Sequence, residues 1–180
     1  MTTTFPTTDL VVLVNDQDHE IGVMDKVEAH RGAGKLHRAI SVFLFNDHGE
    51  LLVQQRSRHK IVGAGQWANT CCGNVRPGES YEACAQRRLR EELGIEGVVL
   101  KPVYKFKYAV HCNDEFSERE MDQVFVGRYN DTVSANPLEV VSHTVVPLTT
   151  CLQKNSAVYN WAPWFEMMMA DQTLISHLRS

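Results

Sequence analysis

Residues 67–80, WANTCCGNVRPGES, concentrate side chains that could do chemistry. Two adjacent cysteines, Cys71 and Cys72, precede Gly73, and a proline, a second glycine and Glu79 follow it. A thiol can act as a nucleophile or exchange a proton, and glycine lets the backbone approach a phosphate closely. Carboxylates one helical turn apart, such as those that follow this stretch, can hold magnesium against phosphate oxygens. These residue types suit a turn-and-helix site for a phosphorylated ligand.

The five cysteines are expected to be reduced thiols. Their count is odd, and neighbouring cysteines rarely meet the geometry of an unstrained disulfide. No leader directs export, so a cytoplasmic location is predicted. Cys84, Cys112 and Cys151 are interpreted as small buried hydrophobic side chains.

One strong helix is predicted over residues 80–93, between strand-like runs that must position the site. Ser80 can cap its first turn, and Gly94 can supply the left-handed residue that ends it. Ala85, Leu89 and Leu93 fall on one face. Apolar runs predict strands at residues 10–15, 21–24, 39–46, 51–56, 67–72, 97–104, 105–111, 121–129 and 139–147, with a hairpin turn at Gly49 and a helix in the tail near residues 161–169. Strands on both sides of a helix favour an α/β or α+β sandwich.

The composition is that of an ordinary soluble globular chain. It has 180 residues, 43% hydrophobic and 22% charged, with a net charge of −4. One domain over residues 1–180 is expected, with residues 1–9 flexible. The absence of a basic stripe argues against nucleic-acid binding, and the short apolar runs argue against a membrane span.

The spacing from Gly73 onward resembles the Nudix box, a loop–helix motif that binds diphosphates through metal ions. Glu79 follows after five residues, Arg87-Arg88-Leu89 after seven more, and Glu91-Glu92 and Gly94-Ile95 complete the pattern. Arg88 stands where Nudix hydrolases carry a metal-binding glutamate. A guanidinium cannot ligate magnesium but can pair with a diphosphate, so the substitution favours holding a diphosphate over cleaving it.

Six further segments make the chain resemble the type I isopentenyl-diphosphate isomerases. They are KVEAHRGAGKLHRAISVFLFN, WANTCCG, RRLREELG, YKFKYAV, EREMDQVF and WAPW. The resemblance implies a Nudix-like α/β/α sandwich with a mixed β-sheet, as a monomer or homodimer. It also implies the interconversion of isopentenyl and dimethylallyl diphosphate by a 1,3 proton shift through a tertiary carbocation.

The same resemblance implies roles for individual residues. Cys72 and Glu120 would exchange the protons, with the direction left open, while Tyr108 would hydrogen-bond the glutamate and Trp164 would steady the cation. The implied diphosphate-binding side chains are Lys26, Arg56, Lys60 and Arg88.

Two metal sites are implied. His30, His37, Glu118 and Glu120 resemble ligands for one Zn²⁺, Mn²⁺ or Mg²⁺, and Glu92 would hold Mg²⁺ with the substrate diphosphate. Asn74 replaces the histidine that the family pattern has as a fifth ligand. An amide oxygen binds hard cations and has little preference for zinc.

Two other functions compete with this interpretation. A Nudix hydrolase of a nucleoside diphosphate derivative would need Glu91 and Glu92 to suffice without the glutamate that Arg88 replaces, and it gives Cys72 no task. A diphosphate-binding protein that has lost catalysis is the other alternative, because of Asn74.

Overall fold

The computed structural model describes residues 10–153 and 158–179, so the expected flexibility of residues 1–9 concerns a segment outside the described residues. The strands are β1 (Leu10–Val14), β2 (Glu20–Asp25), β3 (His37–Phe45), β4 (Glu50–Arg56), β5 (Trp67–Ala68), β6 (Cys71–Asn74), β7 (Leu100–His111), β8 (Ser117–Arg128) and β9 (Val140–Pro147). The helices are α1 (Lys26–His30), α2 (Tyr81–Leu93), α3 (Leu148–Cys151), α4 (Pro163–Ala170) and α5 (Gln172–Leu178).

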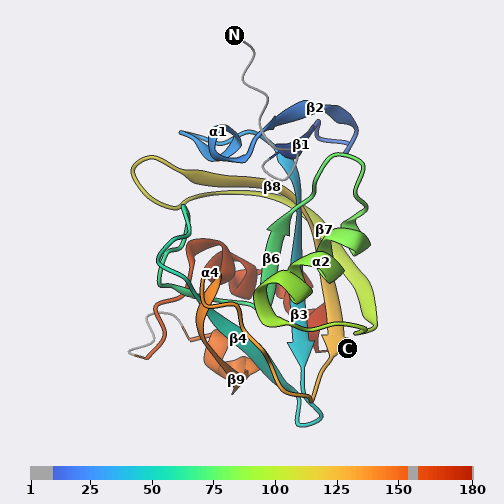
Figure 1. The fold of residues 1–180 in the computed structure, drawn as a ribbon, viewed down its shortest axis with the longest axis vertical. Coiled ribbons are helices and arrows are strands. Elements are labelled where there is room, and N and C mark those ends of the chain that lie inside the picture. Colours follow the sequence, from blue (N-terminus) through green and yellow to red (C-terminus); the bar gives the residue numbers. More distant parts are fainter. Residues whose placement is uncertain (1–9, 154–157, 180) are drawn as a thin grey trace.

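Strand β3 is the centre of a mixed sheet (Figure 1). It pairs in parallel with β8 along its whole length and antiparallel with β6. The hairpin predicted around Gly49 is present, but β3 and β4 pair only at Phe45 and Leu51, next to the turn. Beyond that point β4 leaves β3 and pairs with β5 and β9. The separation of β3 from β4 leaves an edge of β3 for β6, the strand that carries the two adjacent cysteines.

The two faces of β3 carry two separate hydrophobic cores. Ile40, Val42 and Leu44 pack with the apolar face of α2. Phe43 and Phe45, from the alternate positions, pack with α4 and α5. Side chains of a strand point alternately to opposite faces, so a continuous apolar run places hydrophobic side chains on both faces of β3. The result is the predicted α/β/α sandwich.

Helix α2 forms as its sequence predicts. The Ser80 hydroxyl accepts from the Ala83 N–H, and Gly94 adopts the left-handed conformation, with φ of 66°, that ends the helix. Ala85, Leu89 and Leu93 are fully buried. None of the described helices is long and apolar enough to span a bilayer.

Three sequence predictions about elements are wrong in detail. Residues 97–104 and 105–111 do not form separate strands, because β7 runs unbroken from Leu100 to His111. Pro102, which has no N–H to donate, only causes an irregularity in the pairing of β7 with β8. The run 67–72 is divided between β5 and β6. The tail forms two helices, since Asp171 caps a new one, α5.

Candidate active site

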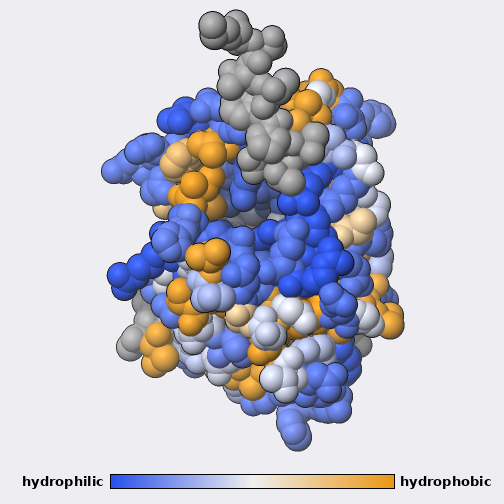
Figure 2. Space-filling view, viewed as in Figure 1, coloured by the Kyte–Doolittle hydropathy of each residue, from blue (hydrophilic) through white to orange (hydrophobic). Residues whose placement is uncertain are grey.

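A cavity opens where β6, β8, α1 and α4 meet beside β3. Eleven of the thirteen predicted site residues line it, and the other two, His37 and Glu92, contact lining residues from behind. In the view of Figure 2, hydrophilic side chains gather across the middle of the molecular face. The predicted residues that line the cavity are Lys26, His30, Arg56, Lys60, Cys72, Asn74, Arg88, Tyr108, Glu118, Glu120 and Trp164.

Side chains alternate between the two faces of strand β6, so the adjacent cysteines point in opposite directions. Cys72 lines the cavity, whereas Cys71 is fully buried on the side of α2, where its thiol donates to Glu92 Oε2 at 3.3 Å. The Cys72 thiol donates to Asn69 Oδ1 at 3.1 Å. Burial, and then the nearby Asp122 carboxyl, raises the pKa of Cys72 to about 12. Cys72 therefore rests as a neutral thiol that faces the ligand space.

Glu120 reaches the cavity from β8, on the opposite side of β3 from Cys72. Its cross-strand neighbour Tyr108 donates a hydrogen bond of 2.6 Å to Glu120 Oε2. Burial and the charge of Glu118 raise the pKa of Glu120 well above its usual value. A carboxyl group of this kind can carry a proton near neutral pH and release it to a reacting atom.

Four buried side chains converge next to Glu120: His30, His37, Glu118 and Glu120 each offer a ligand atom, and these atoms lie within 4.8 Å of one another. His30 Nδ1 lies 2.7 Å from the Lys26 carbonyl, and His37 Nδ1 lies 2.7 Å from the Lys35 carbonyl. A carbonyl only accepts, so each Nδ1 carries a hydrogen, and Nε2 is the atom that each ring can offer to a metal ion.

The oxygen chemistry of the cluster also fits a cation. Glu118 Oε2 lies 3.0 Å from His30 Nε2 but has no hydrogen-bond partner, although it is buried. Buried carboxylate oxygens without partners are costly unless paired with a positive charge. Two imidazoles and two carboxylates together match the donors of a zinc, manganese or similar divalent site. The chain therefore offers a metal site whose ion the residues do not specify.

Asn74 faces this cluster from the end of β6. Its Nδ2 lies 2.9 Å from His37 Nε2 and 3.3 Å from Glu120 Oε1. The Asn74 side chain thus occupies a position from which it could reach an ion bound by the cluster. With an amide instead of imidazole there, the site gains an oxygen donor suited to hard cations.

Cationic side chains line the wall next to α2. The pKa of Lys26 is lowered to about 8 by burial and by repulsion from Lys60, Arg88 and Arg56. Arg56 donates to the Val62 carbonyl and lies over the Trp164 ring, 4.9 Å from its centroid. Such mutual repulsion indicates that the four cations share a region where a multivalent anion would be stabilised.

Trp164 closes the apolar side of the cavity. It lies near the start of α4 with only 2% of its surface exposed. Gly63, at φ of 61°, packs so closely that a Cβ atom there would overlap the indole. The loop before β5 therefore fixes the ring in the cavity wall.

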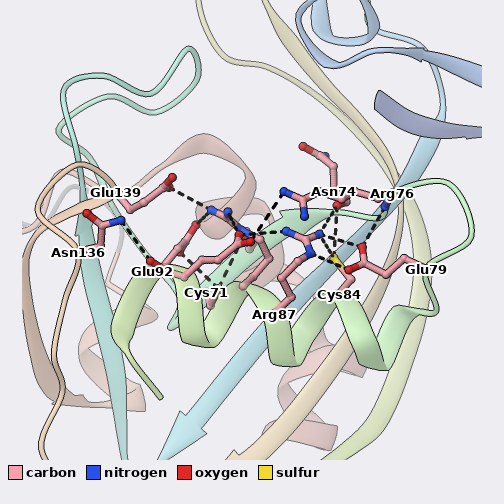
Figure 3. A network of polar contacts seen from close by, with 12 residues as sticks. Cys71, Asn74, Arg76, Glu79, Cys84, Arg87, Glu92, Asn136 and Glu139 are labelled. Carbon is pink, nitrogen blue, oxygen red and sulfur yellow. Dashed lines mark hydrogen bonds and ion pairs between the residues drawn. The ribbon is translucent and has the colours of Figure 1, made fainter. Parts of the chain in front are cut away.

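Helix α2 delivers Arg88 and Glu92 to the site within a dense polar network (Figure 3). A Cβ atom at Gly73 would overlap Arg88 Cγ, so glycine is required for the arginine to cross β6. Glu92 is fully buried, and Arg88, Lys60 and Gln54 surround it and hold its pKa near 2 against the effect of burial.

Sequence reasoning missed four polar residues around these groups. Asn69 accepts from Cys72, and Ser41 donates to the buried Asp122 at 2.8 Å while lying 3.7 Å from Cys72 Sγ. Only Ser41 has a local signal, because it is a polar residue within the otherwise apolar run of β3. Glu139 contacts Arg88 and Lys60, and nothing in its local sequence points to them.

Comparison with known proteins agrees with this architecture. Residues 35–165 match the NUDIX domain model. An isopentenyl-diphosphate Delta-isomerase of Pectobacterium atrosepticum is 37% identical over 161 residues, which cover 89% of both chains. An isopentenyl-diphosphate Delta-isomerase 1 of Aromatoleum aromaticum is 45% identical over 131 residues, which cover 73% of both.

The fold is also shared with a solved structure. DR0079 from Deinococcus radiodurans superimposes with a TM-score of 0.74 over 89% of this chain and 96% of that one, at 22% identity. That likeness establishes the fold, whereas the isomerase relatives are close enough to establish the family. The chain belongs to the isopentenyl-diphosphate Delta-isomerase family of NUDIX-domain proteins.

Proposed function

We propose that this protein interconverts isopentenyl diphosphate and dimethylallyl diphosphate by moving one proton onto the alkene and removing another. One observation carries the proposal: a thiol, a carboxyl group and an indole line the same cavity as four cations. The cations suit a diphosphate, and the other three groups suit proton transfer around a hydrocarbon.

Cys72 and Glu120 are the groups that exchange protons with the substrate. They come from strands on either side of β3, so that a hydrocarbon chain lying across β3 would have one on each flank. Both have raised pKa values, which matches the need for a group that keeps its proton until the alkene is close. Tyr108 holds the Glu120 carboxyl in position.

Trp164 would stabilise the carbocation that forms between the two proton transfers. The face of an indole attracts a cation by about 2 kcal/mol when water is excluded, and this ring is almost fully buried. Shielding by protein also prevents water from trapping the cation. The ring thus has a task beyond packing.

Lys26, Arg56, Lys60 and Arg88 would bind the diphosphate. Glu92 would hold magnesium together with diphosphate oxygens, and His30, His37, Glu118 and Glu120 would hold a second divalent ion. When bound, that second ion would supply positive charge that holds the Glu120 carboxyl in place.

A hydrolytic role has less support from the helix carboxylates. Glu79 pairs with Arg87 at 2.6 Å, and Glu91 pairs with Arg88 at 2.7 Å. Their charges are already neutralised by arginines, and Arg88 itself takes the place of a further carboxylate. The helix is therefore poorly equipped to activate water with metal ions.

The test is incubation with isopentenyl diphosphate and magnesium, followed by product analysis. Dimethylallyl diphosphate is the expected product. Released phosphate would indicate a hydrolase, and saturable binding without product would indicate a protein that has lost catalysis.

Two neighbouring variants sharpen the test. Cys72→Ala should lower turnover at least about a thousandfold, the scale for losing a positioned acid or base. Cys71→Ala should stay within about tenfold of wild type, because Cys71 faces away from the ligand. A reversed order would remove Cys72 from the reaction.

A further inference from the structure

Arg88 already pairs with three carboxylates before any substrate binds. Its Nη1 contacts Glu91 at 2.7 Å, and its Nη2 contacts both Glu92 and Glu139, the latter at 3.0 Å. Lys60 contacts the same two carboxylates, Glu92 and Glu139. Among the described residues, Lys26 and Arg56 form no ion pair. A diphosphate can therefore meet those two cations directly, but it must compete for Arg88 and Lys60.

The two shared carboxylates differ in how firmly they are held. The Glu92 side chain is 1% exposed, and Gln54 Nε2 and the Cys71 thiol also donate to it. The Glu139 side chain is 27% exposed, and Arg88 and Lys60 are its only side-chain partners in the described part of the chain. Glu92 is thus a fixed partner of the cations, and Glu139 is the one that can leave.

The segment that carries Glu139 allows this movement without unfolding. Its N–H donates to the Asn136 carbonyl and its carbonyl accepts from the Ser57 N–H, both at 2.9 Å. The backbone is therefore anchored just before β9, while the carboxylate reaches the network from outside α2 (Figure 3). Rotation about side-chain bonds is enough to withdraw it.

We propose that Glu139 is an internal anion that occupies Arg88 and Lys60 in the free protein and that the substrate diphosphate displaces. This inference rests on the proposed function, because it assumes that these two cations bind the diphosphate. A diphosphate carries more charge than one carboxylate and can bridge all four cations, so it displaces the Glu139 carboxylate from Arg88 and Lys60. Glu139 then sets the affinity: it keeps singly charged anions out of the site and weakens the binding of diphosphates.

The experiment is calorimetric titration with inorganic diphosphate, without added magnesium. Glu139→Gln removes the competing charge but keeps the size of the side chain, so its affinity should rise at least about tenfold, or about 1.4 kcal/mol. Glu91→Gln is the matched control: it also removes a carboxylate from Arg88, but one that does not touch Lys60, and it should change affinity less than about threefold. Unchanged or weaker binding by Glu139→Gln would overturn the proposal.

Two further variants make the outcomes separable. Arg88→Ala should weaken diphosphate binding about tenfold or more, and unchanged binding there would refute the proposed diphosphate site itself. In the Arg88→Ala background, the gain from Glu139→Gln should shrink below about threefold, and a full gain would contradict competition for Arg88. If Glu139→Gln does not fold, Glu139→Asp decides, because a retracted carboxylate should also tighten binding.

Discussion

Replacing Asn74 by histidine tests whether this residue controls the metal site. The amide lies 2.9 Å from His37 Nε2 and 3.3 Å from Glu120 Oε1, so an imidazole on the same Cα atom can reach the same ion. In the structure the amide N–H donates to the Nε2 atom that a metal would need. An ion must therefore break that hydrogen bond before His37 can bind it, at a net cost of about 1 kcal/mol.

The magnitude follows from the change of donor. Imidazole is a good zinc ligand, and even changes outside the ligand set alter metal affinity by about tenfold or more. We expect Asn74→His to raise zinc affinity at least about tenfold, or about 1.4 kcal/mol. Since zinc would bind only the folded chain, stability in excess zinc should rise equally. For a chain of this size that corresponds to roughly 3–6 °C in melting temperature.

The assay is a zinc titration of wild type, Asn74→His and Asn74→Ala. The melting temperature is measured at each zinc concentration, and the zinc affinity is taken from the whole titration curve. Asn74→Ala is the control, because it removes the hydrogen bond to His37 without adding a ligand, so its curve should shift to lower zinc by less than that of Asn74→His. Coincident curves for wild type and Asn74→His would refute the reasoning, since the residue would then not bind the ion. Turnover should follow affinity, because a firmly held ion orients Glu120.

Two further predictions concern single atoms of the site. Glu120→Gln should slow the exchange of solvent deuterium into isopentenyl diphosphate at least about a hundredfold, because an amide cannot transfer the proton, while diphosphate affinity stays within about threefold. Rapid deuterium incorporation, measured by mass spectrometry, would take Glu120 out of the proton path. Gly73→Ala should displace Arg88, because the added Cβ would overlap Arg88 Cγ, and should raise the Michaelis constant about tenfold with a smaller loss of kcat. A normal Michaelis constant would show that Arg88 can bind from elsewhere.

Local signals in the sequence predicted the elements that carry the site. Ser80 and Gly94 specify the ends of α2 through their own hydrogen bonds and φ preference, so the helix was found to within one residue. The apolar run at residues 39–46 predicted a strand, and β3 covers His37–Phe45. The strand boundaries around Pro102 and within residues 67–72 were missed, because they depend on which partner each strand finds.

The spacing of motifs, together with resemblance to a family, also predicted which residues meet in the cavity. Glu79, Arg87 and Arg88 follow Gly73 at fixed distances on a turn and a helix, so their relative positions are set locally. The separate segments that contain His30, Cys72, Glu120 and Trp164 could be placed together only by analogy, since no local rule connects them.

Tertiary structure alone decided which way these side chains point and which partners compensate their charges. The pairing of β6 with β3 turns Cys72 to the cavity and Cys71 to α2, and the parallel alignment of β8 sets Glu120 opposite His37. Glu139 meets Arg88 across 51 positions of sequence. Charge compensation and pKa depend on distance and burial in three dimensions, so the sequence determined the chemical groups of this protein, and the folded chain decided their protonation and their partners.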